Sequence, residues 1–185
     1  MIYFNINKMN AIVFFDPNCS GNSNIKGTIK IHQCSPKSPV LFHVNLTGLS
    51  KDTVHAIHVH EYGNLTKGCM STGSHFNPTN ETHGSYLYPK EPRHVGDLIN
   101  NIQSSKKGVI NYKFWDHLTS LSGPMSIVGR AIVIHEGKDD LGRGGLGPNG
   151  RVINKKVHKE SLKTGNAGGR MACGIIGRDK SHHFT

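Results

Sequence analysis

Short runs rich in valine, isoleucine, phenylalanine and tyrosine recur between clusters of glycine, proline, asparagine and serine. No stretch keeps the spacing of an amphipathic helix over several turns. Branched and aromatic side chains bounded by turn residues are typical of strands. The pattern predicts an all-β fold with eight strands, which favours a sandwich or a barrel. The expected strands span residues 11–16, 24–33, 40–46, 54–60, 96–103, 108–115, 126–135 and 170–177.

Two connections, residues 61–95 and 136–169, are too long to be simple turns. Long loops in compact domains are usually functional or disordered. A chain of 185 residues fits one domain, which we place at residues 9–177, with tails at 1–8 and 178–185.

Charge and hydropathy limit the possible partners. The formal net charge is +10, from 22 Lys and Arg against 12 Asp and Glu, which predicts attraction to anions. The basic residues are scattered, and no helix-turn-helix, zinc-finger or aromatic RNA-binding signature occurs, so we expect no nucleic-acid partner. No apolar run reaches the roughly 20 residues of a membrane helix, and residues 1–10 lack the features of a signal peptide. We therefore expect no membrane partner and a cytoplasmic protein, in the host cytoplasm or virion if the source is viral.

Four cysteines are present, and none form a CxxC pair. This spacing argues against a thiolate zinc site or a thioredoxin-type motif, and it does not show which cysteines pair. We expect Cys19 and Cys34 to be free, unreactive thiols.

The most informative pattern is a series of metal-binding side chains. His58 and His60 share one face of an expected strand, because residues i and i+2 of a strand point the same way. Together they could hold one ion. The order of the further donors along the chain predicts a site for two metal ions. Those donors are His75, His83, His94, Asp97 and His135.

The motifs around these residues resemble those of copper/zinc superoxide dismutases, from about residue 9 to residue 177. They are His58-Val59-His60-Glu61, Gly68-Cys69, His75-Phe76-Asn77-Pro78, Arg93-His94-Val95-Gly96-Asp97-Leu98, His135-Glu136 with Asp139-Asp140-Leu141-Gly142, and the run from Gly165 to Gly174. The resemblance implies an eight-stranded antiparallel Greek-key sandwich or flattened barrel with two long functional loops.

The resemblance also implies a ligand set and a reaction. The copper ligands would be His58, His60, His75 and His135, and the zinc ligands His75, His83, His94 and Asp97. Imidazoles suit copper, and three nitrogens with one carboxylate suit a closed tetrahedral zinc site. The enzyme would convert superoxide to oxygen and hydrogen peroxide, with His75 carrying a proton and Arg170 guiding the anion.

Further positions follow from the same resemblance. Asp139 would hydrogen-bond one copper histidine and one zinc histidine, His58 and His83, and fix their rings. Cys69 and Cys173 would form the intrachain disulfide.

Some features concern assembly or depart from the family pattern. The family usually dimerises through apolar surface, which Ile175 and Ile176 would supply. Gly169 and Met171 replace prolines that accompany dependence on a copper chaperone, so we expect chaperone-independent activation. An extension within residues 146–159 carries Arg151, Lys155, Lys156 and Lys159, which we expect to strengthen the positive field at the copper channel.

Two other functions share this fold. A metal-delivery protein would carry an additional cysteine-rich segment, and an inactive binding module would have lost a copper ligand or Arg170; the sequence shows neither change. The remaining histidines are expected to be ordinary surface or hydrogen-bonded residues. These are His32, His43, His55, His117, His158, His182 and His183.

Overall fold

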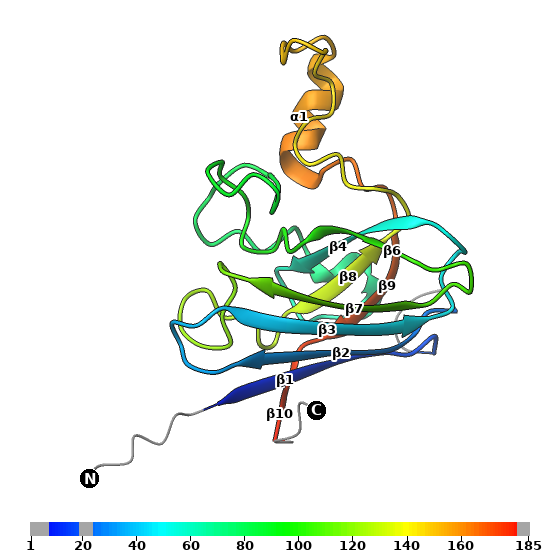
Figure 1. The fold of residues 1–185 in the computed structure, drawn as a ribbon, viewed down its shortest axis with the longest axis vertical. Coiled ribbons are helices and arrows are strands. Elements are labelled where there is room, and N and C mark those ends of the chain that lie inside the picture. The colour runs from blue at the N-terminus through cyan, green and yellow to red at the C-terminus, as the bar shows by residue number, and fades with distance from the viewer. Residues whose placement is uncertain (1–7, 19–23, 181–185) are drawn as a thin grey trace.

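Two antiparallel β-sheets form the body of the molecule in a computed structural model that describes residues 8–18 and 24–180 (Figure 1). One sheet has the strand order β10-β1-β2-β3-β7, and the other has the order β6-β4-β8-β9. This sandwich confirms the predicted all-β class. The strands of the sheets are β1 (Met9–Phe15), β2 (Lys26–Gln33), β3 (Val40–Thr47), β4 (Val54–His60), β6 (Asn100–Gln103), β7 (Ile110–Asp116), β8 (Ala131–His135), β9 (Arg170–Ile175) and β10 (Gly177–Asp179).

The strands differ from the sequence prediction in number and in some boundaries. A short strand β5 (Thr66–Cys69) and a 3-10 turn (Met70–Thr72) lie in the first long loop and were not predicted. β10 was also missed; it pairs with β1, with Ala11 opposite Arg178, so the sheet extends into the expected C-terminal tail. The domain boundaries stay predictions. Expectations about residues 1–7, Cys19, His182 and His183 fall outside the described residues.

Alternation of side chains along the strands builds the core between the sheets. In β3, Val40, Phe42, Val44 and Leu46 are buried while their neighbours face outward. Phe42 stacks on Phe114 of the adjacent β7, with ring centroids 4.9 Å apart. One continuous apolar cluster joins both sheets, and its burial is the main favourable contribution to folding.

Ile175 and Ile176, which were expected to supply a dimer surface, differ in their exposure to solvent. Ile176 is fully buried in the apolar cluster, which corrects the expectation that it lies at an exposed apolar surface. Ile175 is 43 % exposed.

The middle of the four-stranded sheet is covered on both faces. All five residues of β8 are buried, and so are the last six of β4. The first long loop folds back on β4: Val59 donates to the carbonyl of Gly96, Phe76 donates to the carbonyl of Val59, and His60 pairs with His75 in an isolated bridge. The histidines on the outer face of this sheet are therefore buried under the loop.

The second long loop contains a helix that the sequence pattern did not predict, α1 (Lys155–Thr164). The side chain of Asn154 caps its first turn by accepting from the backbone of Val157, and Gly165 ends it in the left-handed conformation. Figure 1 shows α1 and the loop before it projecting from the sandwich. Among the described residues, no helix is long and apolar enough to cross a lipid bilayer.

Candidate metal centre

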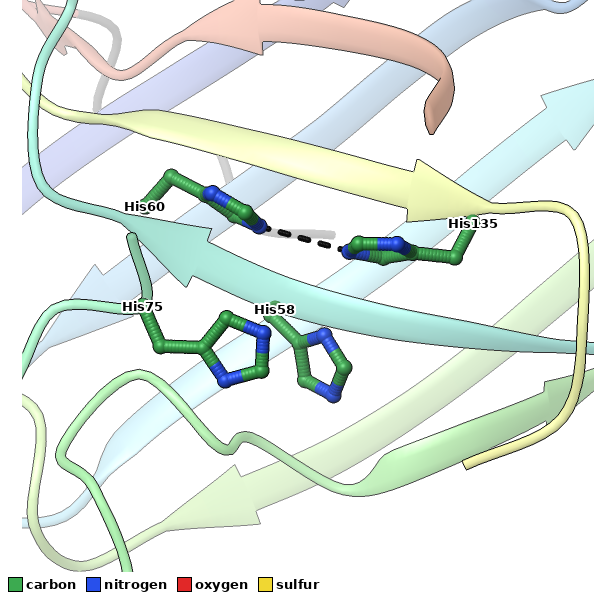
Figure 2. A group of neighbouring side chains, drawn as sticks. All are labelled: His58, His60, His75 and His135. Carbon is green, nitrogen blue, oxygen red and sulfur yellow. Dashed lines mark hydrogen bonds between the residues drawn. The ribbon is translucent and has the colours of Figure 1, made fainter. Parts of the chain in front are cut away.

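Two neighbouring strands and one loop bring four histidines together (Figure 2). His58 and His60 come from β4, His135 ends the adjacent β8, and His75 comes from the loop paired with His60. All four are buried, and one ring nitrogen of each lies within 4.8 Å of the others. His58 and His60 thus lie in one group, and their binding of one ion stays a prediction.

The hydrogen bonds of these rings leave lone pairs pointing at a common space. Nδ1 of His60 donates to the carbonyl of Gly73 at 2.9 Å, and Nδ1 of His135 lies 3.4 Å from the carbonyl of Gly168. With their protons on Nδ1, both rings carry a lone pair on Nε2, and these two Nε2 atoms face each other at 3.3 Å. Two facing lone pairs repel unless a cation or a proton lies between them.

A second group of donors surrounds one oxygen of Asp97. Oδ1 of this carboxylate lies 2.8 Å from Nδ1 of His75, 3.0 Å from Nδ1 of His83 and 3.1 Å from Nδ1 of His94. Nδ1 of His94 is also 3.4 Å from Nδ1 of His75. Three imidazole nitrogens and one carboxylate oxygen at these separations form the donor set of a tetrahedral zinc site. His75 belongs to both groups.

Asp139 connects the two groups from behind. Its Oδ2 accepts from Nε2 of His58 at 2.7 Å, and its Oδ1 lies 3.0 Å from Nε2 of His83. A carboxylate that holds Nε2 protonated leaves Nδ1 of each ring as the metal-binding atom. Nδ1 of His58 is buried and has no hydrogen-bond partner.

These contacts show that the residues fit metal ions. A buried imidazole nitrogen without a partner is costly in an otherwise satisfied structure, and a metal ion is the partner that its lone pair can take. The first group offers imidazoles alone, which suits copper, and the second offers a mixed nitrogen and oxygen set, which suits zinc.

Burial and neighbouring charges shift the pKa values of these side chains in opposite directions. Burial, with the nearby His58, lowers the pKa of His75 to about 3. Burial also lowers the pKa of His60 and of His135. For His83 burial acts in the same direction, but the carboxylates of Asp139 and Asp97 outweigh it and raise the pKa to about 10.

The two carboxylates remain ionised for the complementary reason. Burial alone would raise the pKa of Asp97, but contacts with His75, His83 and His94 lower it well below its usual value. The histidines beside Asp139 lower its pKa in the same way, against the effect of burial. The metal-free site therefore holds two fixed negative charges and the neutral rings of His60, His75 and His135, which are ready to bind a metal, whereas His83 would have to release a proton to do so.

A cavity of about 820 Å³ opens onto this centre. Its lining includes His60, His75 and His135 together with the basic residues Arg170 and Lys163. None of the four basic residues expected to act from the extension, Arg151, Lys155, Lys156 and Lys159, is among the lining residues.

Arg170 is held rigidly at the wall. One terminal nitrogen of its guanidinium donates to the carbonyl of Cys69 at 2.8 Å and to the hydroxyl of Thr72 at 3.1 Å. The other donates to the carbonyl of Gly73 at 2.8 Å. Cys69 and Cys173 form a disulfide between the first long loop and β9, which ties the acceptor of Arg170 to the sheet that carries Arg170. Cys34, by contrast, is a free and exposed cysteine.

The structure brings every predicted site residue to this one region, and it adds residues that the sequence did not point to. Asn100 donates to Oδ2 of Asp139 at 3.1 Å, and Asn101 exchanges two hydrogen bonds with the backbone of Asp139. His55, expected to be a surface or hydrogen-bonded histidine, is buried and has Nδ1 3.0 Å from the carbonyl of His135, as the hydrogen-bonded alternative predicts. Asn100 has a positive φ of 63°, but no local signal in the sequence shows that it contacts Asp139.

Comparison with known proteins gives consistent matches. The family model described as copper/zinc superoxide dismutase matches residues 25–176. The chain is 43 % identical over 157 residues to a "Superoxide dismutase [Cu-Zn]" of Saccharomyces cerevisiae, covering 85 % of this chain and 92 % of the relative. Proteins with the same description from Candida glabrata (42 % identical over 158 residues) and Neurospora crassa (43 % over 157 residues) match with the same coverage.

Proposed function

The chain belongs to the copper/zinc superoxide dismutase family, and from that premise we propose which of its residues carry the reaction. The protein is an enzyme that converts superoxide to oxygen and hydrogen peroxide, using copper and zinc, and so acts in antioxidant defence. When bound, copper supplies a change of oxidation state that passes an electron between two superoxide anions, and zinc supplies a fixed charge.

The copper ligands that we propose are His58, His60, His75 and His135. The proposed zinc ligands are His75, His83, His94 and Asp97. The observation that carries this assignment is the convergence of three Nδ1 atoms on Oδ1 of Asp97 at 2.8 to 3.1 Å. The facing Nε2 atoms of His60 and His135 support the copper assignment. Asp139 would hold the tautomers of His58 and His83 on which both sets depend.

His75 is proposed as the proton carrier. Its Nδ1 faces Asp97 in the zinc group, which leaves Nε2 for the copper group and the cavity. The low pKa of His75 favours the neutral ring, so a proton taken up at Nε2 would be released readily to a peroxide anion.

Arg170 is proposed to guide and orient superoxide. Its guanidinium borders the cavity, and its three hydrogen bonds fix the direction in which its remaining donors point. Burial lowers the pKa of Arg170 below its ordinary value, yet an arginine keeps its charge in neutral solution. A fixed cation at the entrance raises the local concentration of a small anion.

The experiment that tests the assignment compares the wild type with His135→Ala. We would measure copper and zinc per chain by elemental analysis and superoxide disproportionation on the same samples. The expected result is loss of copper and of activity while zinc is retained, because His135 belongs to the copper group alone. Full copper in the variant, or full zinc without copper in the active wild type, would contradict the proposal.

We also propose how the protein assembles, how it is activated and where it is located. A homodimer is supported by the exposure of Ile175 beside the first long loop. Ile175→Asp should shift the protein to a monomer in light scattering.

Gly169 and Met171, in place of the family's prolines, support activation without a copper chaperone. Inactivity in chaperone-deficient cells with ample copper would contradict that. A cytoplasmic location would be tested by fractionating the cells that make the protein.

A further inference from the structure

The arm, which we define as residues 146–164, comprises α1 and the loop before it, and its far end has no role in the proposed reaction. The arm projects from the sandwich with the loop at its far end, and the C-terminal end of α1 lies at its base (Figure 1). Only the last part of α1 reaches the cavity, where Leu162, Lys163 and Thr164 line the wall. The far end of the arm therefore does not contact the cavity above the metal centre.

The surface of the arm is strongly basic. It carries five basic side chains, all exposed, and Glu160 as its one acidic side chain. The basic residues are Arg151, Lys155, Lys156, Lys159 and Lys163. Four of them stay outside the cavity lining, so their direct contacts are with whatever approaches the outside of the arm.

The far end of the arm is also apolar. Ile153 is 75 % exposed, and Val152 and Val157 are 46 % and 39 % exposed. A single exposed apolar residue is ordinary, but three within six positions, at the tip of a projecting element and beside lysines, form a patch. The exposed loop at residues 105–107, by contrast, carries one serine and two lysines.

The backbone holds this tip in one shape. The amides of Ile153 and Asn154 both donate to the carbonyl of Gly145, at 2.9 and 3.0 Å, and Leu146 pairs with Val152 in an isolated bridge. At the base, Ser161 donates to Asp140, and the side chain of Asn166 reaches from there to the carbonyl of Val157 in the first turn of α1. The apolar side chains are thus presented outward by a structured hairpin.

We propose that the arm docks on a lipid surface that carries anionic headgroups. Lysines and an arginine would contact the headgroups, while Ile153 and Val152 would enter the boundary between headgroups and acyl chains. A nucleic acid would satisfy the charges but offers no apolar layer for Ile153, so the observations favour the lipid surface. Docking on the surface of a membrane needs no membrane-spanning helix. The expectation of no membrane partner followed from the lack of an apolar run long enough for such a helix.

The test uses the metal-loaded full chain and vesicles in co-sedimentation. Vesicles of phosphatidylcholine alone are compared with vesicles that contain about 30 % phosphatidylserine, at low and high salt. We expect binding to the anionic vesicles that weakens as salt screens the charges. Ile153→Asp should weaken binding about tenfold or more, the effect of losing one buried apolar side chain and adding a like charge. Lys155→Glu/Lys156→Glu should weaken it by about 30-fold or more.

Two matched controls separate the arm from general surface properties. Leu87→Asp changes another exposed apolar residue, 63 % exposed, and Lys106→Glu/Lys107→Glu makes the same charge change in a different loop. Both controls should bind anionic vesicles like the wild type at moderate salt. The Ile153 variant should keep wild-type superoxide disproportionation, so failure of the docking proposal and failure of the proposed function are distinguishable.

A fluorescence probe tests insertion directly. The chain has one tryptophan, Trp115 in β7, so Ile153→Trp in a Trp115→Phe background reports only on the tip. A blue shift with anionic vesicles supports the proposal. It is overturned by absence of binding at low salt, by equal binding of Ile153→Asp and wild type, or by single-stranded DNA that binds as tightly as the vesicles and depends on the lysines but not on Ile153.

Discussion

Oδ2 of Asp139 lies 2.7 Å from Nε2 of His58, in a region where both side chains are fully buried. The same carboxylate reaches His83 with its other oxygen, so one side chain sets the tautomer of a histidine in each metal group. The carboxylate is itself fixed by Asn100, whose side chain also donates to the carbonyl of Gly84. The geometry of both groups therefore depends on a residue that is in neither.

Asp139→Asn should weaken zinc binding more than it changes the fold. An amide nitrogen next to Nε2 of His83 would drive the ring proton to Nδ1, which then cannot bind zinc. We expect a loss of about 10–100-fold in zinc affinity, measured by competition with a chelator. Asp52→Asn, at an exposed turn, is the matched control and should bind zinc like the wild type. Unchanged zinc affinity in the Asp139 variant would show that the tautomer is set elsewhere.

Arg170→Gln should slow the reaction and reduce its dependence on salt. Removing the cation at the cavity wall should lower kcat/KM by roughly tenfold at low ionic strength, because steering of a small anion is lost. Arg170→Lys should lie between the two, since lysine keeps the charge but not the fixed planar donors that bond to Cys69 and Gly73. The measurement is the rate against ionic strength. Arg178→Gln makes the same change in net charge on β10 and should leave the rate near that of the wild type; equal effects of the two would argue against a local role.

Opening the disulfide should affect both stability and Arg170. Cys69 and Cys173 are 104 residues apart, and closing a loop of that length contributes ~4.7 kcal/mol in the chain-entropy model. Cys69→Ser/Cys173→Ser should therefore lower the free energy of unfolding by about 2–5 kcal/mol in urea titrations. It should also lower activity, because the carbonyl of Cys69 is an acceptor for Arg170. Loss of stability with full activity would mean that the backbone around Cys69 keeps its shape without the bond.

The pattern of apolar and polar residues predicted the positions of strands whose side chains alternate between core and solvent. It predicted strands wrongly where apolar side chains are buried in loops. Residues 40–46 were predicted as a strand and form most of β3 (Val40–Thr47), in which buried residues alternate with more exposed ones. The strand expected at 96–103 begins only at Asn100, because the preceding residues, including buried Leu98, follow the turn in which the backbone of His94 donates to Asp97.

The helix α1 was missed for a different reason. Its one fully buried side chain is Ser161, so it lacks the apolar stripe on which helix prediction depends. The sequence features that could have indicated this helix lie at its ends: Asn154 caps its first turn, and Gly165 follows its last turn. The metal-binding side chains could be proposed because they form motifs, whereas the contact of Asn100 with Asp139 arises only when two distant loops meet.

Stability of the metal-free protein should depend on pH in two opposite ways. His60, His75 and His135 have lowered pKa values when folded, so as pH falls below 6.5 the unfolded chain takes up protons that the folded chain does not, and stability is lost. The raised pKa of His83 contributes stability that is complete below 6.5 and is lost as pH rises through about 10.

The metal-free protein should therefore be most stable near neutral pH. Below about pH 6 the free energy of unfolding should fall by at least about 1.4 kcal/mol per pH unit, the slope for one net proton. Urea titrations at a series of pH values would measure this. His75→Gln should reduce the acid slope by about one proton, and a flat profile between pH 6 and 5 would contradict neutral burial of these rings.

The end of α1 passes so close to the metal centre that a side chain there should disturb it. Gly165 has a φ of 64°, and a Cβ at this position would collide with the carboxylate of Asp139 and lie 2.6 Å from Nε2 of His83. Gly165→Ala should therefore push apart the pair that sets the zinc-binding nitrogen. Gly150, in the arm, has a similar φ of 74° but open space around its Cβ direction, so Gly150→Ala carries the same backbone strain without the collision.

Both alanine variants should lose about 1–2 kcal/mol of stability from the left-handed backbone, as measured by urea unfolding. Only Gly165→Ala should also lose zinc affinity, by about tenfold or more in chelator competition, because only there are Asp139 and His83 displaced. Zinc affinity is thus the readout that separates the collision from the strain. If the two variants bind zinc equally well, the contact between Asp139 and His83 tolerates a displaced chain at Gly165, and its role in fixing the tautomer of His83 would have to be abandoned.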